Sequence, residues 1–186
     1  MNNFTMVDLC SKALNKIGAN EILSFDEGTP EAEFSRSIYP VLKHKLLSSF
    51  PWSFAVKIVK LNKMVNEMEE SEYVNCFLLP ADFIRAVKIS SKLPYKIIGD
   101  KLFCDASVVV LTYIADVDEC MFSSAFVSAF IYAIAAELSM SLLDDVTKFN
   151  LFNRLYNSEL REARFLDSVQ ESPKKINDFS LIDVRF

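Results

Sequence analysis

One stretch of the chain limits the possible folds more than any other, because residues 121–143 contain a single charged side chain, Glu137. A run of 23 such residues is long enough to cross a bilayer. Five serines and five alanines lower its hydrophobicity, however, and both flanks carry acidic residues in place of the basic ones that anchor a membrane helix. We therefore expect a central helix that is buried on most of its faces, and no membrane span.

Helical periodicity extends over four segments. These are residues 6–17, 30–50, 122–143 and 146–169. Thr5 is placed to cap the start of the first helix, Gly18 to end it, and Thr29 to cap the second. The fourth helix has an apolar stripe that we expect to continue to Leu166 and Val169.

Between the two helix pairs, apolar residues alternate with polar ones, which is the pattern of β-strands. The alternation begins at Trp52, and an acidic loop is expected at residues 63–72. We predict a small, mainly antiparallel sheet of about four to six short strands. The fold class is then α+β, with the terminal helix pairs forming a bundle and residues 52–114 inserted between them. Residues 1–170 are expected to form a single domain.

The C-terminal segment, residues 171–186, ends in a way that is unusual for a chain terminus. Its apolar side chains are Phe179, Leu181, Ile182, Val184 and Phe186. Chain ends are normally polar, so we expect this segment to be covered, either by its own domain or by a neighbouring subunit. We favour the neighbour and treat the segment as a docking tail, because segments that cross between chains often add a strand or fill a groove.

The charge balance excludes one class of function. The net charge is −5, and the lysines and arginines form no stripe along the sequence. Proteins that bind nucleic-acid phosphates usually carry a basic patch. We therefore expect no specific nucleic-acid binding, although DNA could slide past an acidic wall.

The sequence offers little for catalysis. His44 is the only histidine and lies between two lysines, the four cysteines have no CxxC spacing, and the three glycines are isolated. General acid–base catalysis most often uses histidine, zinc sites need several Cys or His ligands, and phosphate-binding loops need glycines at close spacing. None of these patterns is present in the sequence. We predict no catalytic, cofactor-binding or metal-binding residue, and a structural subunit that assembles with copies of itself.

Glu137 is the charged residue that most needs a partner, because it interrupts an apolar helix. Arg36 or Arg85 could pair with it inside the subunit. The other hypothesis is a salt bridge between subunits, so we include Glu137 among the candidate interface residues.

Three short motifs then suggest a family. They are residues 9–19, LCSKALNKIGA, with Leu14 and Gly18; residues 50–55, FPWSFA, with Pro51, Trp52 and Phe54; and residues 79–85, LPADFIR, with Pro80 and Asp82. In this order and spacing the sequence resembles the head–tail adaptor family of short-tailed bacteriophages, the group of tail tubular protein A and the tail accessory factors. The acidic stretch 63–72 and the apolar C-terminus depart from that pattern.

The resemblance implies a connector without enzymatic activity. About a dozen copies would form a ring under the portal protein, join the capsid to the tail and extend the DNA channel. The partners would be other copies of the chain, the portal, the tail nozzle protein and passing DNA that is not held. The location would be the neck of the virion, after synthesis in the bacterial cytoplasm from a phage or prophage gene.

Two other functions stay open from the sequence. The chain could be a cytoplasmic small-ligand-binding or regulatory oligomer with an α+β fold. It could also be a membrane-associated module that uses residues 121–143.

Overall fold

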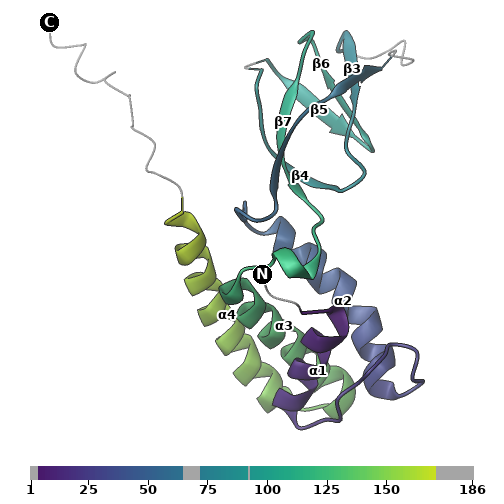
Figure 1. The fold of residues 1–186 in the computed structure, drawn as a ribbon, viewed down its shortest axis with the longest axis vertical. Helices are drawn as coiled ribbons and strands as arrows, with labels where there is room; N and C mark the ends of the chain where they lie inside the picture. The colour runs from purple at the N-terminus through teal and green to yellow at the C-terminus, as the bar shows by residue number, and fades with distance from the viewer. Residues whose placement is uncertain (1–3, 65–71, 92, 171–186) are drawn as a thin grey trace, which may run out of the picture.

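The computed structural model describes residues 4–64, 72–91 and 93–170, which fold into an α+β structure. The described residues form four α-helices, one short 3-10 helix and two small antiparallel sheets. The molecule is elongated, with the helices at one end and the strands at the other, as Figure 1 shows. We call these two regions the helical part and the strand part.

The four helices lie close to the predicted positions. They are α1 Met6–Ile17, α2 Pro30–Ser48, α3 Ser124–Leu143 and α4 Val146–Ser168, and the 3-10 helix η1, which was not predicted, is Glu119–Met121. The predicted caps are confirmed: the Thr5 hydroxyl accepts a hydrogen bond from the Asp8 amide at 3.2 Å, and Thr29 caps α2. Gly18 ends α1 at a φ of 80°, a left-handed conformation that glycine adopts without a steric cost.

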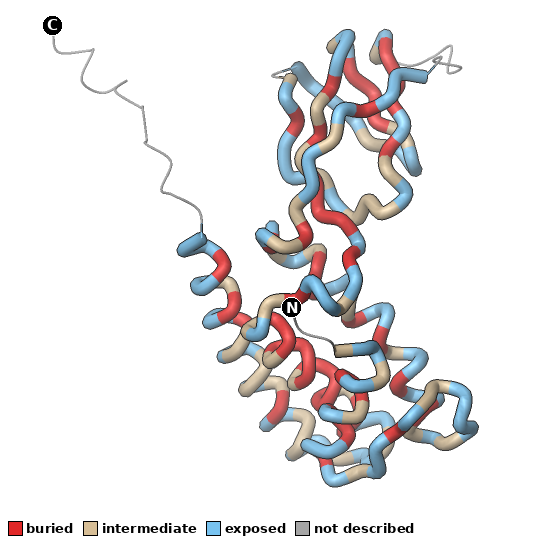
Figure 2. The backbone as a smooth tube through the Cα atoms, in the orientation of Figure 1, coloured by how far each residue is buried: buried red, intermediate tan, exposed pale blue. Residues whose placement is uncertain are grey.

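Helix α3 is the core of the helical part. It contacts α1, α2 and α4, and its buried side chains include Phe126 and Phe130. Leu14 of α1 is fully buried in the same cluster. Figure 2 shows many buried residues along α3. Among the described helices, α3 alone is long and apolar enough to cross a bilayer, and 61% of its most apolar window is buried inside the protein, as is common for core helices.

The strand part differs from the single sheet that we predicted. One sheet has the order β1-β7-β4, and the other has the order β2-β3-β6-β5. Their bounds are β1 Val56–Lys60, β7 Val110–Ala115, β4 Phe83–Ile89, β2 Asn62–Met64, β3 Asn75–Leu78, β6 Lys101–Cys104 and β5 Tyr95–Ile98. Leu111 of the first sheet and Phe77 and Leu102 of the second belong to one buried cluster. Two sheets form because small sheets bury an apolar face by packing on each other.

Two boundaries in this region were also predicted wrongly. Residues 52–55 form a turn and not the start of a strand, because the amides of Ala55 and Val56 donate to the Trp52 carbonyl at 2.9 and 3.0 Å. The Ala55 amide is thus used within the turn, and the paired residues of β1 begin at Val56. Residues 63 and 64, the first two of the expected acidic loop, belong to β2 and pair with β3 instead, and residues 65–71 lie outside the described part.

Trp52 gives the first testable prediction. Its side chain is fully buried, and its Nε1 donates to the Leu46 carbonyl at 2.9 Å. Trp52→Ala should lower the free energy of unfolding by about 3–5 kcal/mol through the lost packing. Trp52→Phe should lower it by about 0.5–1.5 kcal/mol, because one hydrogen bond is lost while the Ser49 amide and hydroxyl still donate to the Leu46 carbonyl.

Urea unfolding followed by circular dichroism measures both effects, since Trp52 is the only tryptophan and its fluorescence disappears in the variants. Phe165→Ala is the control, because that ring is 66% exposed and its loss should cost no more than about 0.5 kcal/mol. Equal losses for Trp52→Ala and the control would contradict the prediction.

Candidate functional site

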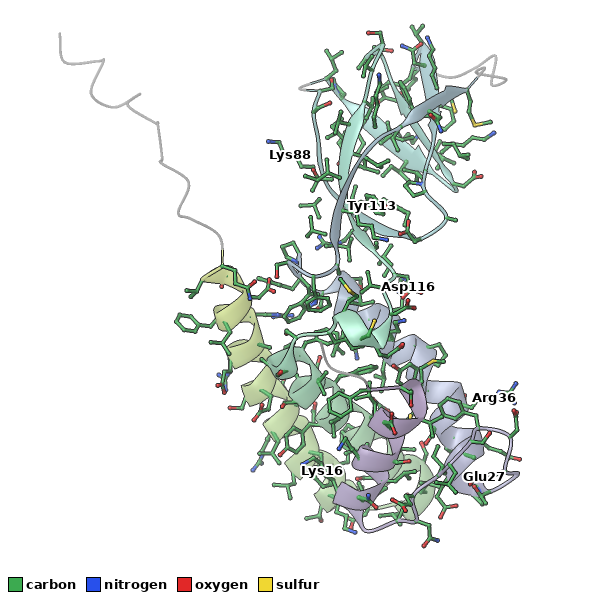
Figure 3. All side chains as sticks on the ribbon, viewed as in Figure 1. Lys16, Glu27, Arg36, Lys88, Tyr113 and Asp116 are labelled. Carbon is green, nitrogen blue, oxygen red and sulfur yellow. The ribbon has the colours of Figure 1, made fainter. Side chains whose placement is uncertain are left out.

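Two of the family-like segments meet at one place in the structure, although they are far apart in the sequence. The Ala55 carbonyl accepts a hydrogen bond from the Ala115 amide at 2.9 Å. The Asp82 carbonyl accepts one from the Asp116 amide at 2.8 Å. Residues 50–55 and 79–85 therefore hold the end of β7, where the strand part joins the helical part. We call this region the junction, and Figure 3 labels Tyr113 and Asp116 within it.

The aromatic side of the junction is built on Trp52. Its ring packs edge-on against Phe126 of α3 at 5.0 Å and stacks on Phe54 at 5.9 Å. Phe54, which is half-buried, also contacts Phe122. Pro51 is exposed and directly follows the residues that end α2. These contacts fix the direction in which the chain leaves α2 and enters β1.

Asp82 forms the polar side of the junction. Its carboxylate accepts hydrogen bonds from Lys57 Nζ at 2.7 Å and from the Tyr113 hydroxyl at 2.9 Å, which ties the turn before β4 to both other strands of that sheet. Pro80 closes the turn through its carbonyl, which accepts from the Phe83 amide at 3.1 Å. Burial alone raises the pKa of Asp82, but the bonds from Lys57 and Tyr113 outweigh it and lower that pKa below its ordinary value. Burial and the neighbouring carboxylate raise the pKa of Tyr113 to about 12.

A second polar cluster connects α2 to the segment before α3. The Tyr39 hydroxyl donates to Glu119 at 2.8 Å, and Lys43 Nζ lies 3.2 Å from Glu119 and 3.0 Å from Asp116. Burial and the bond to Glu119 raise the pKa of Tyr39. Burial lowers the pKa of Lys43, but the two carboxylates reverse this and hold it above its ordinary value. Each group in the cluster has a partner, so its clear effect is to hold α2 against the segment between β7 and α3.

The sequence analysis missed the contribution of α4 to the junction. Asp167 is 6% exposed and accepts hydrogen bonds from the Ser53 amide at 3.0 Å and the Ser53 hydroxyl at 2.7 Å. One turn earlier, Arg164 donates to the Ser49 hydroxyl at 3.2 Å. A signal was present, because Asp167 continues the helical spacing of the buried residues Leu160 and Ala163.

The apolar stripe of α4 was consequently assigned to the wrong residues at its end. Leu166 is 47% exposed and Val169 is 67% exposed. Both are apolar and fit the spacing of the stripe. The residue in this turn of α4 that faces the junction is Asp167, which is buried.

Glu137 is half-buried and lines a small pocket of about 40 Å³ together with Lys45, Asn153 and Tyr156. The expected pairing with Arg36 is wrong, because Arg36 pairs with Asp26 at 3.1 Å. Arg85 lies exposed on β4, and within the described residues it makes no ion pair with Glu137. The salt bridge between subunits stays a prediction.

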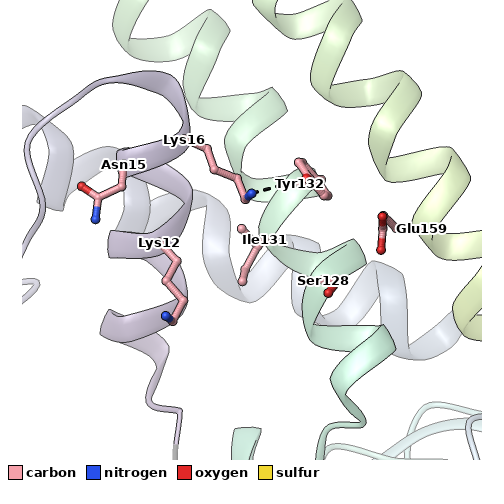
Figure 4. Close-up of a pocket in the computed structure, with 7 residues that line it drawn as sticks. All are labelled: Lys12, Asn15, Lys16, Ser128, Ile131, Tyr132 and Glu159. Carbon is pink, nitrogen blue, oxygen red and sulfur yellow. Dashed lines mark hydrogen bonds between the residues drawn. The ribbon is translucent and has the colours of Figure 1, made fainter.

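An open pocket lies between α1, α3 and α4, as Figure 4 shows. It has a volume of about 410 Å³ and is lined by Lys12, Asn15, Lys16, Ser128, Ile131, Tyr132 and Glu159. Lys16 Nζ lies 3.3 Å from the Tyr132 hydroxyl and 4.4 Å above the centre of its ring. Lys12 Nζ lies 5.1 Å from the centre of the Phe4 ring, so cation–π contacts already occupy both lysines of the pocket.

Few reactive groups gather elsewhere. In residues 4–64, 72–91 and 93–170, no three His, Cys, Asp or Glu side chains come close enough together to hold a metal ion. His44 is exposed on α2. Cys10, Cys76 and Cys104 are buried, and burial raises the pKa of Cys10 to about 12, which keeps that thiol protonated.

The remaining candidate interface residues lie outside the described part of the chain. They are Phe179, Leu181, Ile182, Val184 and Phe186, all within residues 171–186. Their role in docking stays a prediction.

The sequence matches no model of a protein family, and no curated protein matches it.

The lowered pKa of Asp82 gives a prediction of pH dependence. A carboxyl group whose pKa is lowered by folding stabilises the protein above its ordinary pKa of 3.8, and this contribution is lost as the pH falls through the lower folded value. Asp82→Asn should therefore be less stable than the wild type at pH 7. The difference between the two proteins should shrink in the acid range.

Urea midpoints measured across that range test this, with Asp100→Asn as the matched control because Asp100 is exposed in the turn between β5 and β6. A difference between wild type and Asp82→Asn that stays constant with pH would contradict the assigned role.

Asp167 gives a prediction about the junction itself. Asp167→Ala should lower the free energy of unfolding by about 1.5–3 kcal/mol, because it removes hydrogen bonds to a charged acceptor. It should also speed hydrogen exchange at the Ser53 amide, which loses its acceptor. Nuclear magnetic resonance measures that exchange directly.

Glu162→Ala, at an exposed position on the same helix, is the control and should leave the Ser53 amide protected. Unchanged exchange at Ser53 in Asp167→Ala would show that α4 does not hold this turn.

Proposed function

We propose that the chain is a structural head–tail connector subunit of a short-tailed bacteriophage or prophage. Copies of the chain assemble as a ring under the portal, join the capsid to the tail nozzle and extend the channel through which DNA passes. The role is mechanical and needs no catalytic residue or cofactor.

One observation carries this proposal. The family-like residues are not scattered over the surface but have structural roles, most of them in one junction. Trp52 anchors the exit from α2, Asp82 ties the strands together, and Gly18 ends α1 in the left-handed conformation. Motifs that share a structural task support a resemblance in fold, since chance matches would have no reason to meet in space.

The proposal includes a finer arrangement of the fold. The two helix pairs form one bundle, and residues 52–114 are an insertion that leaves the bundle after α2 and returns before α3. Residues 1–170 act as one domain. The contacts of α3 with α1, α2 and α4 support the bundle, and the hydrogen bonds at the junction support the connection to the strands.

The surface is also suited to assembly. Several large apolar side chains are exposed on both parts of the molecule, among them Leu23, Ile58, Phe165 and Val169. Phe165 and Val169 are four residues apart at the end of α4, a spacing that places them on one side of the helix. The tail residues and Glu137 remain further candidates for contacts with a neighbouring copy or the portal.

Light scattering tests the proposal. The purified protein should form a ring of about a dozen copies, or a monomer that enters a large complex when the portal of the same phage is added. A protein that stays monomeric in both samples would sink the proposal. The alternative of a small-ligand-binding oligomer would then be pursued at the pocket between α1, α3 and α4.

Removal of residues 176–186 gives the last prediction of this section. The truncated chain should keep the urea midpoint of the full chain, because the proposal assigns these residues to docking and not to the core of the subunit. It should fail to enter the complex with the portal. A truncation that lowers the midpoint strongly would place the segment in the core of its own subunit instead.

A further inference from the structure

One face of the sheet β1-β7-β4 is open and positively charged. Ile58, Thr112 and Lys88 pair across the three strands, so their side chains share one face. Lys60 lies two residues further along β1 on the same face, and Arg85 lies one row nearer the helices. Ile58 is 72% exposed, and the three basic residues are exposed as well. We call these five residues the basic sheet face.

No acidic side chain balances this face. The described residues in its rows include no Asp or Glu. The described strand part as a whole, residues 52–64, 72–91 and 93–115, carries seven lysines and arginines and four acidic residues. The described helical part, residues 4–51 and 116–170, carries nine basic and fifteen acidic residues. The acidic net charge therefore conceals two regions of opposite sign.

The loop between α1 and α2 has the complementary composition. Leu23 is 85% exposed, and Glu21, Asp26 and Glu27 beside it are also exposed. The Glu27 carboxylate accepts hydrogen bonds from the amides of Leu23 and Ser24, which fixes the turn that presents the leucine. We call Glu21, Leu23, Asp26 and Glu27 the acidic loop.

The two surfaces cannot meet within one molecule. Lys88 projects from the strand part, whereas Glu27 lies at the far end of the helical part, on the other side of the molecule (Figure 3). Each surface has an exposed aliphatic side chain, and the charges beside it are basic on the sheet face and mainly acidic at the loop, where Arg36 pairs with Asp26. A second copy of the chain supplies the missing complement for each of them.

We propose that the basic sheet face of one copy docks on the acidic loop of the next. This inference rests on the proposed function, because it identifies a contact through which copies assemble. Two different patches make a heterologous contact, and repetition of such a contact closes a ring when the rotation between copies allows it. Opposite charges speed the encounter and set the register, while Ile58 and Leu23 provide apolar area at the centre.

A second copy fits the basic sheet face better than nucleic acid does. Three cations make few phosphate contacts, and the acidic helical part of the same molecule repels a polyanion. The ion pair between Asp26 and Arg36 does not block docking, because both side chains are largely exposed and such pairs contribute little.

A charge reversal tests the contact in the full chain. Lys60→Glu combined with Lys88→Glu should weaken self-association at least about tenfold in dissociation constant. Sedimentation velocity over a range of concentrations, alone and with the portal, measures the effect. Raising the salt concentration should weaken the wild-type assembly in the same direction.

The matched control carries Lys63→Glu and Lys96→Glu, at two exposed lysines on the other sheet. It changes the net charge equally and should assemble like the wild type. Circular dichroism checks that both double variants remain folded.

The complementary reversal, Glu21→Lys with Asp26→Lys, should disrupt assembly alone and restore it when combined with the reversed sheet face. Restoration requires the two surfaces to touch, which loss of stability cannot imitate.

The outcomes separate this inference from the proposed function. If the variant with Lys60→Glu and Lys88→Glu forms rings like those of the wild type, the proposed contact between copies is wrong. The connector proposal would then be unaffected. A wild-type chain that never associates, with or without the portal, would overturn both. Loss of binding to a double-stranded oligonucleotide with unchanged self-association would assign the face to nucleic acid and overturn the contact.

Discussion

The burial of Trp52 is the constraint on which the rest of the structure depends. Its indole fills the space between α2, α3 and the first strand, and its N–H satisfies the Leu46 carbonyl at the end of α2. The Ser49 amide and hydroxyl donate to the same carbonyl, so Trp52 adds to the bonds that hold the end of α2. The aromatic contacts that follow, through Phe54 to Phe122 and Phe126, set the angle between the helices and the strands.

The polar groups around this aromatic centre divide the task of holding the two parts together. Asp82 ties the strands to each other, while Glu119 and Asp116 tie α2 to the chain that enters α3. Asp167 adds the last helix through Ser53. Four distant segments thus converge on one region through carboxylates, each with a donor within hydrogen-bond distance, so that partly buried charges are compensated.

The helices could be predicted from the sequence because caps and periodicity are local signals, as at Thr5, Gly18 and Thr29. The division into two sheets could not, since it depends on pairing between strands far apart in the chain. The resemblance to a family pointed to Trp52 and Asp82, but the sequence did not predict which residues they contact. Asp167 was missed because an acidic residue on a mainly polar helix is ordinary until its partner is known.

The bond between Asp167 and Ser53 has a mechanical consequence. Asp167 lies in the last turn of α4, which ends at Ser168, so a force applied along the chain at the end of this helix reaches Asp167 within one helical turn. The load then passes through Ser53 into the turn beside Trp52, and from there into both α2 and β1. A pull on this end of the molecule would be borne by the joint between its two parts and would not simply peel α4 from the surface.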